Sequence, residues 1–230
     1  MSGERAKRIV AERRRFLRGA VSAAGLALAW CAAPAAGRAP KRGEHEEAEV
    51  TPGEDLMQEH GVLERVLLVY EEAARRIEHG ESLDLGVVTR GAAIVRRFVE
   101  DYHERLEEQY VFPRLQKAQQ QVELVATLLR QHQRGREATD EIVRRVGAGG
   151  GAELVPMLRG FSAMYRPHAA REDTVLFPAF RGVVGRSAYR ELGEQFENEE
   201  HQRFGEHGFE STVVEVAQLE VALGIDQLKD

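Results

Sequence analysis

Histidine and glutamate recur at one fixed spacing in two segments of this 230-residue sequence, and the spacing is typical of a metal site. The first copy reads His103-x-x-x-Glu107 followed by Val-Phe-Pro, and the second reads His168-x-x-x-Glu172 followed by Leu-Phe-Pro. Residues four positions apart lie on the same face of a helix, so each pair presents an imidazole and a carboxylate together. Imidazole and carboxylate without thiolate suit iron or manganese, and zinc is also compatible.

Each pair follows a segment with one further histidine in its apolar stripe, which is His60 after Gln58-Glu59 and His132 after Arg130-Gln131. The sequence therefore predicts an internal duplication of a helical hairpin that carries His and then His-x-x-x-Glu. Four imidazoles and two carboxylates in one core would leave costly unpaired charge, which a pair of metal ions removes. A buried His–Glu hydrogen-bond network without metal is the competing interpretation. The predicted ligands are His60, His103, Glu107, His132, His168 and Glu172.

The elements that position these residues are predicted to be helices. From residue 54 onward the apolar spacing is helical, without the sustained alternation of strands. Apolar stripes repeat every three or four positions in four segments, near residues 54–79, 85–117, 121–146 and 153–180. Short connections between them predict an all-α fold, an up-down-up-down four-helix bundle over residues 54–182. An additional C-terminal helix, roughly 187–228 within residues 183–230, is expected to fold back and pack on the bundle.

The first 39 residues have a different character. A basic stretch, RRRFLR at residues 13–18, precedes an uncharged apolar run at 20–37 that contains Ala-Pro-Ala. This order predicts a secretory signal peptide, and the paired arginines resemble a twin-arginine export signal. We expect a periplasmic or extracellular protein with no membrane attachment after cleavage. An uncleaved membrane anchor is the alternative.

The charge of the remaining chain is strongly acidic. Residues 1–39 contain eight of the 32 bases and two of the 38 acids, which leaves the rest with a net charge of −12. Residues 40–53 are predicted to form an acidic flexible leader. No broad basic surface suggests a nucleic-acid partner. The single cysteine, Cys31, excludes a disulfide framework and an iron–sulfur site.

The duplicated motif resembles the hemerythrin-like family, whose His-His-Glu cation-binding domains hold a non-haem di-iron centre in a four-helix bundle. The resemblance covers about residues 55–180. It implies two oxo-bridged irons with the four histidines as terminal ligands and with Glu107 and Glu172 as bridging carboxylates. Manganese or zinc ranks below iron. A ferritin-like site needs Glu-x-x-His on two helices, and only Glu100-x-x-His103 fits that pattern here.

Two positions depart from the oxygen-carrying hemerythrins. Arg136 stands where carriers have a fifth histidine, and Asp173, next to Glu172, stands where they usually place the second carboxylate. The pattern is closer to non-carrier branches, including mycobacterial hemerythrin-like proteins and an iron-sensing F-box domain. Glu104 matches an extra carboxylate of the latter. Glu104 and Asp173 are therefore weaker ligand candidates.

The missing histidine changes the coordination count. Two six-coordinate irons offer about twelve positions, of which the predicted ligands and one bridging oxygen fill about ten, so about two stay open. Open positions on both irons favour chemistry on bridging small molecules. Tyr110 and Tyr165 are expected to face the site, either as iron ligands or as donors of protons and electrons. Ordinary core packing of both rings is the alternative.

The resemblance implies an exported di-iron protein that binds or reacts with O2, hydrogen peroxide or nitric oxide. If the protein is an enzyme, the expected activity is catalase-like or peroxidase-like. An iron or oxygen sensor, or an iron store, without turnover is the alternative, and a zinc-bound or metal-free structural bundle is a third. Four further histidines are expected to be solvated or to cover the bundle: His45, His79, His201 and His207.

Overall fold

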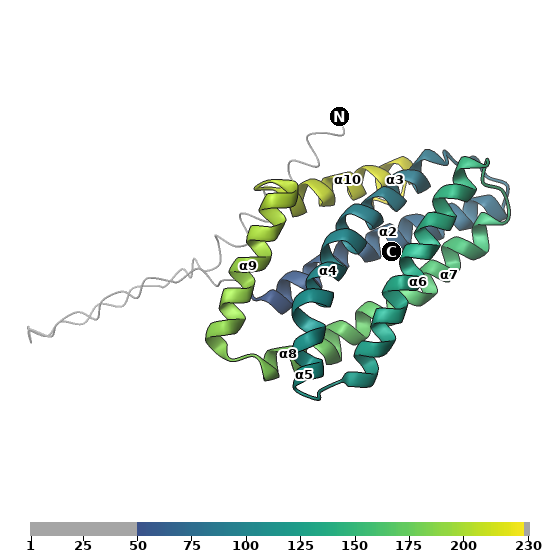
Figure 1. Cartoon of the computed structure of the whole chain (residues 1–230). Coiled ribbons are helices and arrows are strands. Elements are labelled where there is room, and N and C mark those ends of the chain that lie inside the picture. The colour runs from purple at the N-terminus through teal and green to yellow at the C-terminus, as the bar shows by residue number, and fades with distance from the viewer. Residues whose placement is uncertain (1–49, 228–230) are drawn as a thin grey trace, which may run out of the picture. The chain divides into compact units, whose positions relative to one another are not determined.

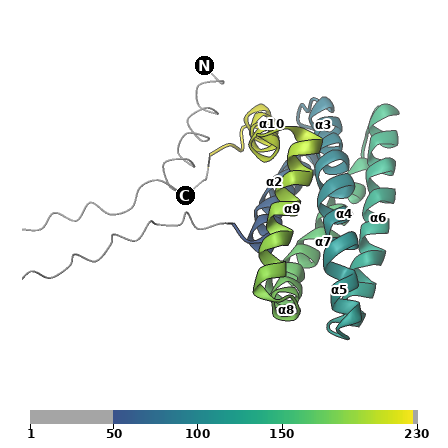
Figure 2. The same cartoon turned by 60° about the vertical axis from the view of Figure 1, so that its left-hand side comes forward.

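The computed structural model describes residues 50–227, and these residues form six helices and no strand. Four long helices make an up-down-up-down bundle, so the predicted all-α fold is confirmed (Figures 1 and 2). The first is α2 (Pro52–Glu78) and the third is α6 (Val122–Gly147). The export signal predicted for 1–39 and most of the predicted leader lie outside the described residues.

The first bundle helix starts two residues before the predicted boundary because of its capping sequence. Thr51 is the N-cap, its hydroxyl accepts from the backbone N–H of Glu54, and the Glu54 side chain accepts from the N–H of Thr51. Pro52 occupies the first helical position, where its missing N–H is not needed. The motif Thr-Pro-Gly-Glu is therefore a complete helix start.

The second and fourth bundle helices are continuous rods with wide π-helical turns inside them. The second rod consists of α3 (Gly86–Ile94), η1 (Val95–His103), α4 (Glu104–Leu106), η2 (Glu107–Val111) and α5 (Phe112–Lys117). The fourth consists of α7 (Leu154–Arg171), η3 (Glu172–Leu176) and α8 (Phe177–Val183). Both rods thus widen at the glutamate of the duplicated motif.

One part of the bundle interior is a mostly apolar core, and it anchors the helices that carry the polar centre. Tyr70 lies about 15 Å beyond His60 along α2, at 1.5 Å of rise per residue. It is fully buried against Phe161 of α7, with ring centroids 5.4 Å apart. Leu158 and Ile142 are also fully buried in this core. Such close-packed side chains fix the rotation of each helix, and that rotation aims its polar residues.

The C-terminal extension forms two helices instead of the single helix predicted for 187–228. These are α9 (Arg186–Phe204) and α10 (Gly208–Leu223). Gly205 separates them with φ of +82°, a backbone conformation that side chains disfavour. Both helices pack on α2, and α10 also covers α3 (Figure 2). Arg65 of α2 holds α10 through a two-nitrogen contact with the carboxylate of Glu220, at 2.8 and 2.5 Å.

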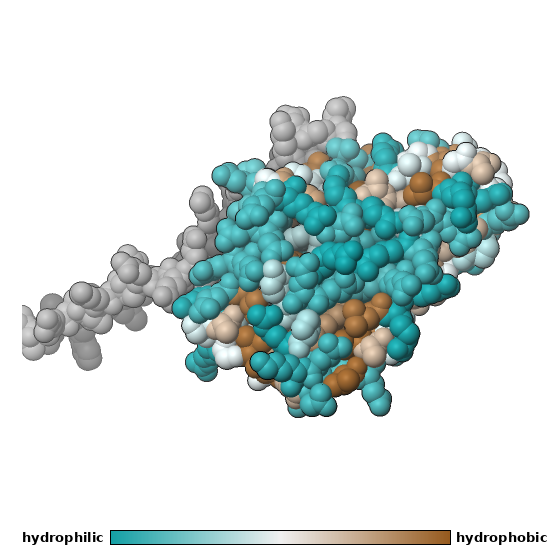
Figure 3. Space-filling model, in the orientation of Figure 1, coloured by the Kyte–Doolittle hydropathy of each residue, from teal (hydrophilic) through white to brown (hydrophobic). Residues whose placement is uncertain are grey.

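The outer face is mostly hydrophilic in the view of Figure 3, with a few separate apolar patches. Among the described residues, no helix has the length and apolar character needed to cross a membrane. Apolar side chains of all four bundle helices are gathered in the buried core.

Candidate metal centre

The structure brings all six predicted ligands together in the bundle interior. Nε2 of His168 lies 3.0 Å from Oε2 of Glu172, and Nε2 of His60 lies 3.4 Å from the same oxygen. Nε2 of His132 and of His103 lie 3.4 and 3.7 Å from Oε2 of Glu107. Each helix of the bundle thus contributes one imidazole, and the second and fourth rods each add one carboxylate.

These separations fit donors arranged around shared cations. Two ligand atoms about 2.1 Å from one ion and at right angles lie about 3.0 Å apart. The donors form two groups within which all ligand atoms lie within 4.8 Å of one another. Both groups contain Glu107, so a carboxylate that bridges two ions is compatible with the geometry. The groups are His60, His103 and Glu107, and Glu107, His132, His168 and Glu172.

The outer nitrogen of every one of these histidines contacts a side-chain oxygen. Nδ1 of His60 lies 2.7 Å from Oδ1 of Asp173, and Nδ1 of His103 lies 2.7 Å from Oε2 of Glu59. When these carboxylates are ionised they only accept hydrogen bonds, so Nδ1 is then the donor, and once a metal displaces any proton from Nε2 its lone pair points toward the centre. Such outer partners orient metal-bound histidines and fix their tautomer.

The remaining two histidines follow the same rule. Nδ1 of His132 lies 3.1 Å from Oε1 of Glu108, and Nδ1 of His168 lies 3.0 Å from Oε1 of Gln131. The two residues Glu59 and Gln131 each precede the first histidine of a hairpin and serve the second histidine of that hairpin. The orienting role of Glu59, Glu108 and Gln131 was not predicted from the sequence. The duplication extends to these flanking positions and is the signal that identifies them.

Asp173 is placed one residue beyond the inward carboxylate, as Glu108 is in the other rod. Its Oδ1 bonds to the outer nitrogen of His60, and its side chain is 34% exposed, whereas Glu172 is fully buried. The geometry therefore places Glu172 among the inward donors and Asp173 behind a histidine. This is the arrangement expected for an orienting residue, not for a bridging carboxylate.

The protein does not satisfy all of the inward donor atoms by hydrogen bonds. Nε2 of His103, Nε2 of His132 and both oxygens of Glu107 are buried and have no hydrogen-bond partner among residues 50–227. Buried polar atoms are rarely left in this state. Inward lone pairs with no protein partner are the chemistry that a cation satisfies, so the residues fit the metal centre that the motif predicts.

The pKa values of the centre show the effect of burying several ionisable groups together. Burial raises the pKa of Glu107 well above its usual range, and the charge of Glu172 raises it further. Burial also acts to raise the pKa of Glu172, but His168 and His60 outweigh burial and hold that pKa below its usual range. Burial lowers the pKa of His132 to about 4 and also lowers that of His103. Neutral imidazole is the form that binds a metal ion.

Backbone chemistry explains why both glutamates sit at wide turns. The N–H of Phe112 bonds to the carbonyl of Glu107, and the N–H of Phe177 bonds to that of Glu172, five residues earlier in each case. Each phenylalanine precedes a proline, which has no N–H and crowds the carbonyl four residues before it. A π turn at this point relieves the crowding and is common at functional sites.

Arg136 fills the place of the missing fifth histidine with an ion-pair network. Its Nη2 lies 2.7 Å from Oε2 of Glu104 and 2.7 Å from Oε1 of Glu108. The hydroxyl of Tyr165 donates to the other oxygen of Glu104 at 2.8 Å. Glu104, Glu108 and His132 also lie close enough to hold an ion, but the guanidinium of Arg136 already supplies positive charge there.

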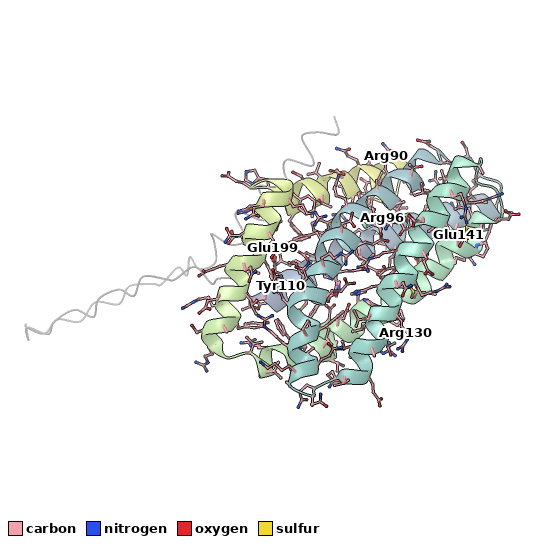
Figure 4. All side chains as sticks on the ribbon, viewed as in Figure 1. Arg90, Arg96, Tyr110, Arg130, Glu141 and Glu199 are labelled. Carbon is pink, nitrogen blue, oxygen red and sulfur yellow. The ribbon has the colours of Figure 1, made fainter. Side chains whose placement is uncertain are left out.

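The two tyrosine candidates lie in different surroundings. Tyr165 is buried beside His168, with ring centroids 5.5 Å apart, and its hydroxyl is committed to Glu104. Tyr110 does not face the centre as expected. Its hydroxyl donates to Oε1 of Glu199 on α9 at 2.5 Å, and Figure 4 shows these two side chains near one another. Tyr110 therefore ties the second rod to α9.

Comparisons with known proteins agree with this geometry. Residues 51–180 match the family described as the hemerythrin HHE cation binding domain. Uncharacterized proteins of Mycobacterium tuberculosis and Mycobacterium bovis are each 44% identical over 227 residues, which covers 94% of this chain and 89% of theirs. No solved structure was found to match the chain.

Proposed function

Because this chain belongs to the hemerythrin HHE cation-binding family, we propose that it holds two irons and binds or reacts with O2, hydrogen peroxide or nitric oxide. The family assignment and the buried His–Glu groups support cation binding. The choice of iron, the number of two and the small ligands are the proposal. Manganese and zinc are the competing metals.

The observation that carries the proposal is the orientation of the four imidazoles. All four outer nitrogens contact an oxygen, at distances of 2.7 to 3.1 Å, so the inner nitrogens are available as ligands. His60 and His103 would hold one ion, and His132 and His168 the other. Glu107 and Glu172 lie between these pairs and would hold both ions.

The chain itself supplies enclosure, orientation and proton placement. A bound iron pair would supply redox chemistry toward small oxidants. Glu107 and Glu172 are fully buried, and so is His132, which keeps bulk water away from the donors. Tyr165 holds a proton on its hydroxyl against Glu104, beside the centre. Nη2 of Arg136 lies 2.7 Å from the same carboxylate and supplies a positive charge to it.

A second candidate function is an iron or oxygen sensor, or an iron store, without turnover. The observation in its favour is the burial of all six donors, of which the most exposed residue, His60, is 6% accessible. Buried ligands retain an ion and allow a reversible response without release of product. Both functions use the same centre, and a turnover assay separates them.

The test is iron quantitation combined with peroxide decay on one sample. We expect about two irons per chain, and rapid peroxide decay that His103→Ala abolishes. His201→Ala is the matched control, because His201 is a 40% exposed histidine on α9 outside the bundle. Reversible spectral change under oxygen without peroxide decay supports the sensor. Zinc alone, or no metal after expression in iron-rich medium, contradicts the proposal.

Export is the remaining element of the proposal, and it is supported by the order of basic, apolar and small residues in the first 39 positions. Replacement of Arg13 and Arg14 by lysine tests it, because twin-arginine export depends on that pair. We expect the double variant to stay inside the cell while the unaltered chain is found outside the cytoplasm. Equal distribution of the two proteins contradicts the export assignment.

A further inference from the structure

A cavity of about 330 Å³ opens between α2 and α7 beside the metal centre. His60, one of the predicted ligands, lines it together with Tyr165, which lies against His168. The cavity therefore borders the centre at His60 and its orienting partner Asp173. A volume near the lower end of the usual range for small-molecule pockets suits small ligands rather than large organic substrates.

The walls of this cavity are apolar and its rim is acidic. Leu63 and Leu67 of α2 and Ala169 of α7 are among the apolar side chains that line it. Glu64 and Asp173 also line it, and their side chains are 47% and 34% exposed, which places their carboxylates at the rim. Arg166, the cation at the rim, is already engaged by Glu64 at 2.9 Å and by Glu71, so its charge is balanced. An anion approaching this opening meets more negative than positive charge.

Burial of the donors points to the same side of the cluster. His60 is the most exposed of the six donors at 6%, whereas Glu107, Glu172 and His132 have no exposure. Near His132, Arg136 contacts the carboxylates of Glu104 and Glu108 and so occupies the space on that side. A small molecule that reaches the donors therefore meets the least obstruction beside His60.

We propose that this cavity is the entry for small uncharged molecules to the metal centre, and that its apolar walls and acidic rim admit them in preference to anions. The inference deepens the proposed function and rests on it, since it names the route and the ligand class for the same centre. Gly61 is the position at which the route can be closed. It lines the cavity, and a Cβ built there meets no atom within 4 Å.

The first test is Gly61→Phe, with Gly160→Phe as its matched control. Gly160 lies in α7, is exposed, and likewise has nothing within 4 Å of an added Cβ, but it does not line the cavity. The rate of nitric oxide association with reduced, iron-loaded protein is measured by stopped flow. We expect Gly61→Phe to slow association about tenfold or more with iron content unchanged, and Gly160→Phe to match the unaltered chain.

A second measurement does not depend on iron. Xenon under pressure should shift the amide NMR signals of Gly61 and Ala169 in metal-free protein, and Gly61→Phe should abolish those shifts. Ala169→Leu on the facing helix repeats the blockade if Gly61→Phe fails to fold. Absence of xenon shifts, or an unchanged nitric oxide rate in a variant that blocks xenon, overturns the entry proposal. Xenon binding in a protein that takes up no iron keeps the cavity assignment and contradicts the proposed function instead.

Discussion

Nδ1 of His60 lies 2.7 Å from Oδ1 of Asp173, although 113 positions separate the two residues in the chain. His132 has an equivalent partner in Glu108, which belongs to the other hairpin. The residue after the inward glutamate of each hairpin thus orients the first histidine of the opposite hairpin. Neither hairpin forms an oriented donor set alone, so the duplication produces one centre and not two.

The first prediction separates an orienting residue from a ligand at neighbouring positions. Asp173→Ala should weaken metal affinity by about 10–100-fold while saturating metal still fills the centre, because only the support of His60 is lost. Glu172→Ala should instead reduce the number of ions bound. Chelator competition measures the affinity and elemental analysis the stoichiometry. Equal loss of bound ions in both variants would make Asp173 a ligand.

The second prediction concerns Glu107, whose substitution should have opposite effects on metal-free and metal-loaded protein. Glu107→Gln replaces an unpartnered carboxyl by an amide whose NH2 can donate to the unpartnered inward acceptors around it, so the metal-free form should gain about 1–3 kcal/mol of unfolding free energy. The metal-loaded form should lose stability because a shared ligand is gone. Thermal unfolding with and without chelator measures the direction of the stability change in each form. Destabilisation of both forms contradicts the assignment.

The third prediction is the pH dependence of the metal-free protein. Burial raises the pKa of Glu59 to about 8. Burial acts to lower the pKa of His60, but the carboxylates of Asp173 and Glu172 outweigh burial and raise that pKa to about 9. The folded state therefore holds protons that the unfolded state releases above pH 4.5 for Glu59 and above pH 6.5 for His60. Stability should fall as the pH rises from 6.5 through 9.

Thermal melts of chelator-treated protein at both ends of that pH range measure this slope. Glu59→Gln is the matched variant, and its slope should be smaller because one proton-binding group is gone. The metal-loaded protein should also show a smaller slope, since bound metal displaces the proton from His60. A metal-free protein whose melting temperature rises with pH over the range would contradict the pKa assignment.

The fourth prediction tests the ion pair that replaces the fifth histidine. Arg136→Ala should cost about 3–5 kcal/mol of unfolding free energy, because it leaves the buried carboxylate of Glu104 without its cation. Adding Glu104→Gln should recover most of that loss. Glu104→Gln alone should leave the number of bound ions unchanged, since Tyr165 and Arg136 hold both oxygens of Glu104. A lower metal content in that variant would make Glu104 a ligand.

Helical periodicity and the duplicated motif were enough to predict the bundle and to group the inward side chains of the centre. His168 and Glu172 share a helix face by spacing alone, and the structure places their atoms 3.0 Å apart. The contacts of the outer nitrogens could not be predicted, because they depend on how each helix is rotated against its neighbour. Tyr110 shows the same limit, since its hydroxyl turns to Glu199 and not inward.

Local backbone features explain the other differences. The break between α9 and α10 depends on Gly205 adopting a left-handed φ, which an amphipathic stripe does not reveal. The Thr51 capping box, by contrast, was present in the sequence and marks the helix start two residues before the predicted one. The π turns before Pro113 and Pro178 follow from the chemistry of proline in a helix.

Anomalous diffraction from iron-loaded crystals, recorded at the iron edge, tests the central claim most directly. We expect two peaks, about 3.5–4 Å apart, between the inward nitrogens of the four histidines and the carboxylates of Glu107 and Glu172. A single peak beside Glu104 and Glu108, or no peak in the bundle interior, would contradict it.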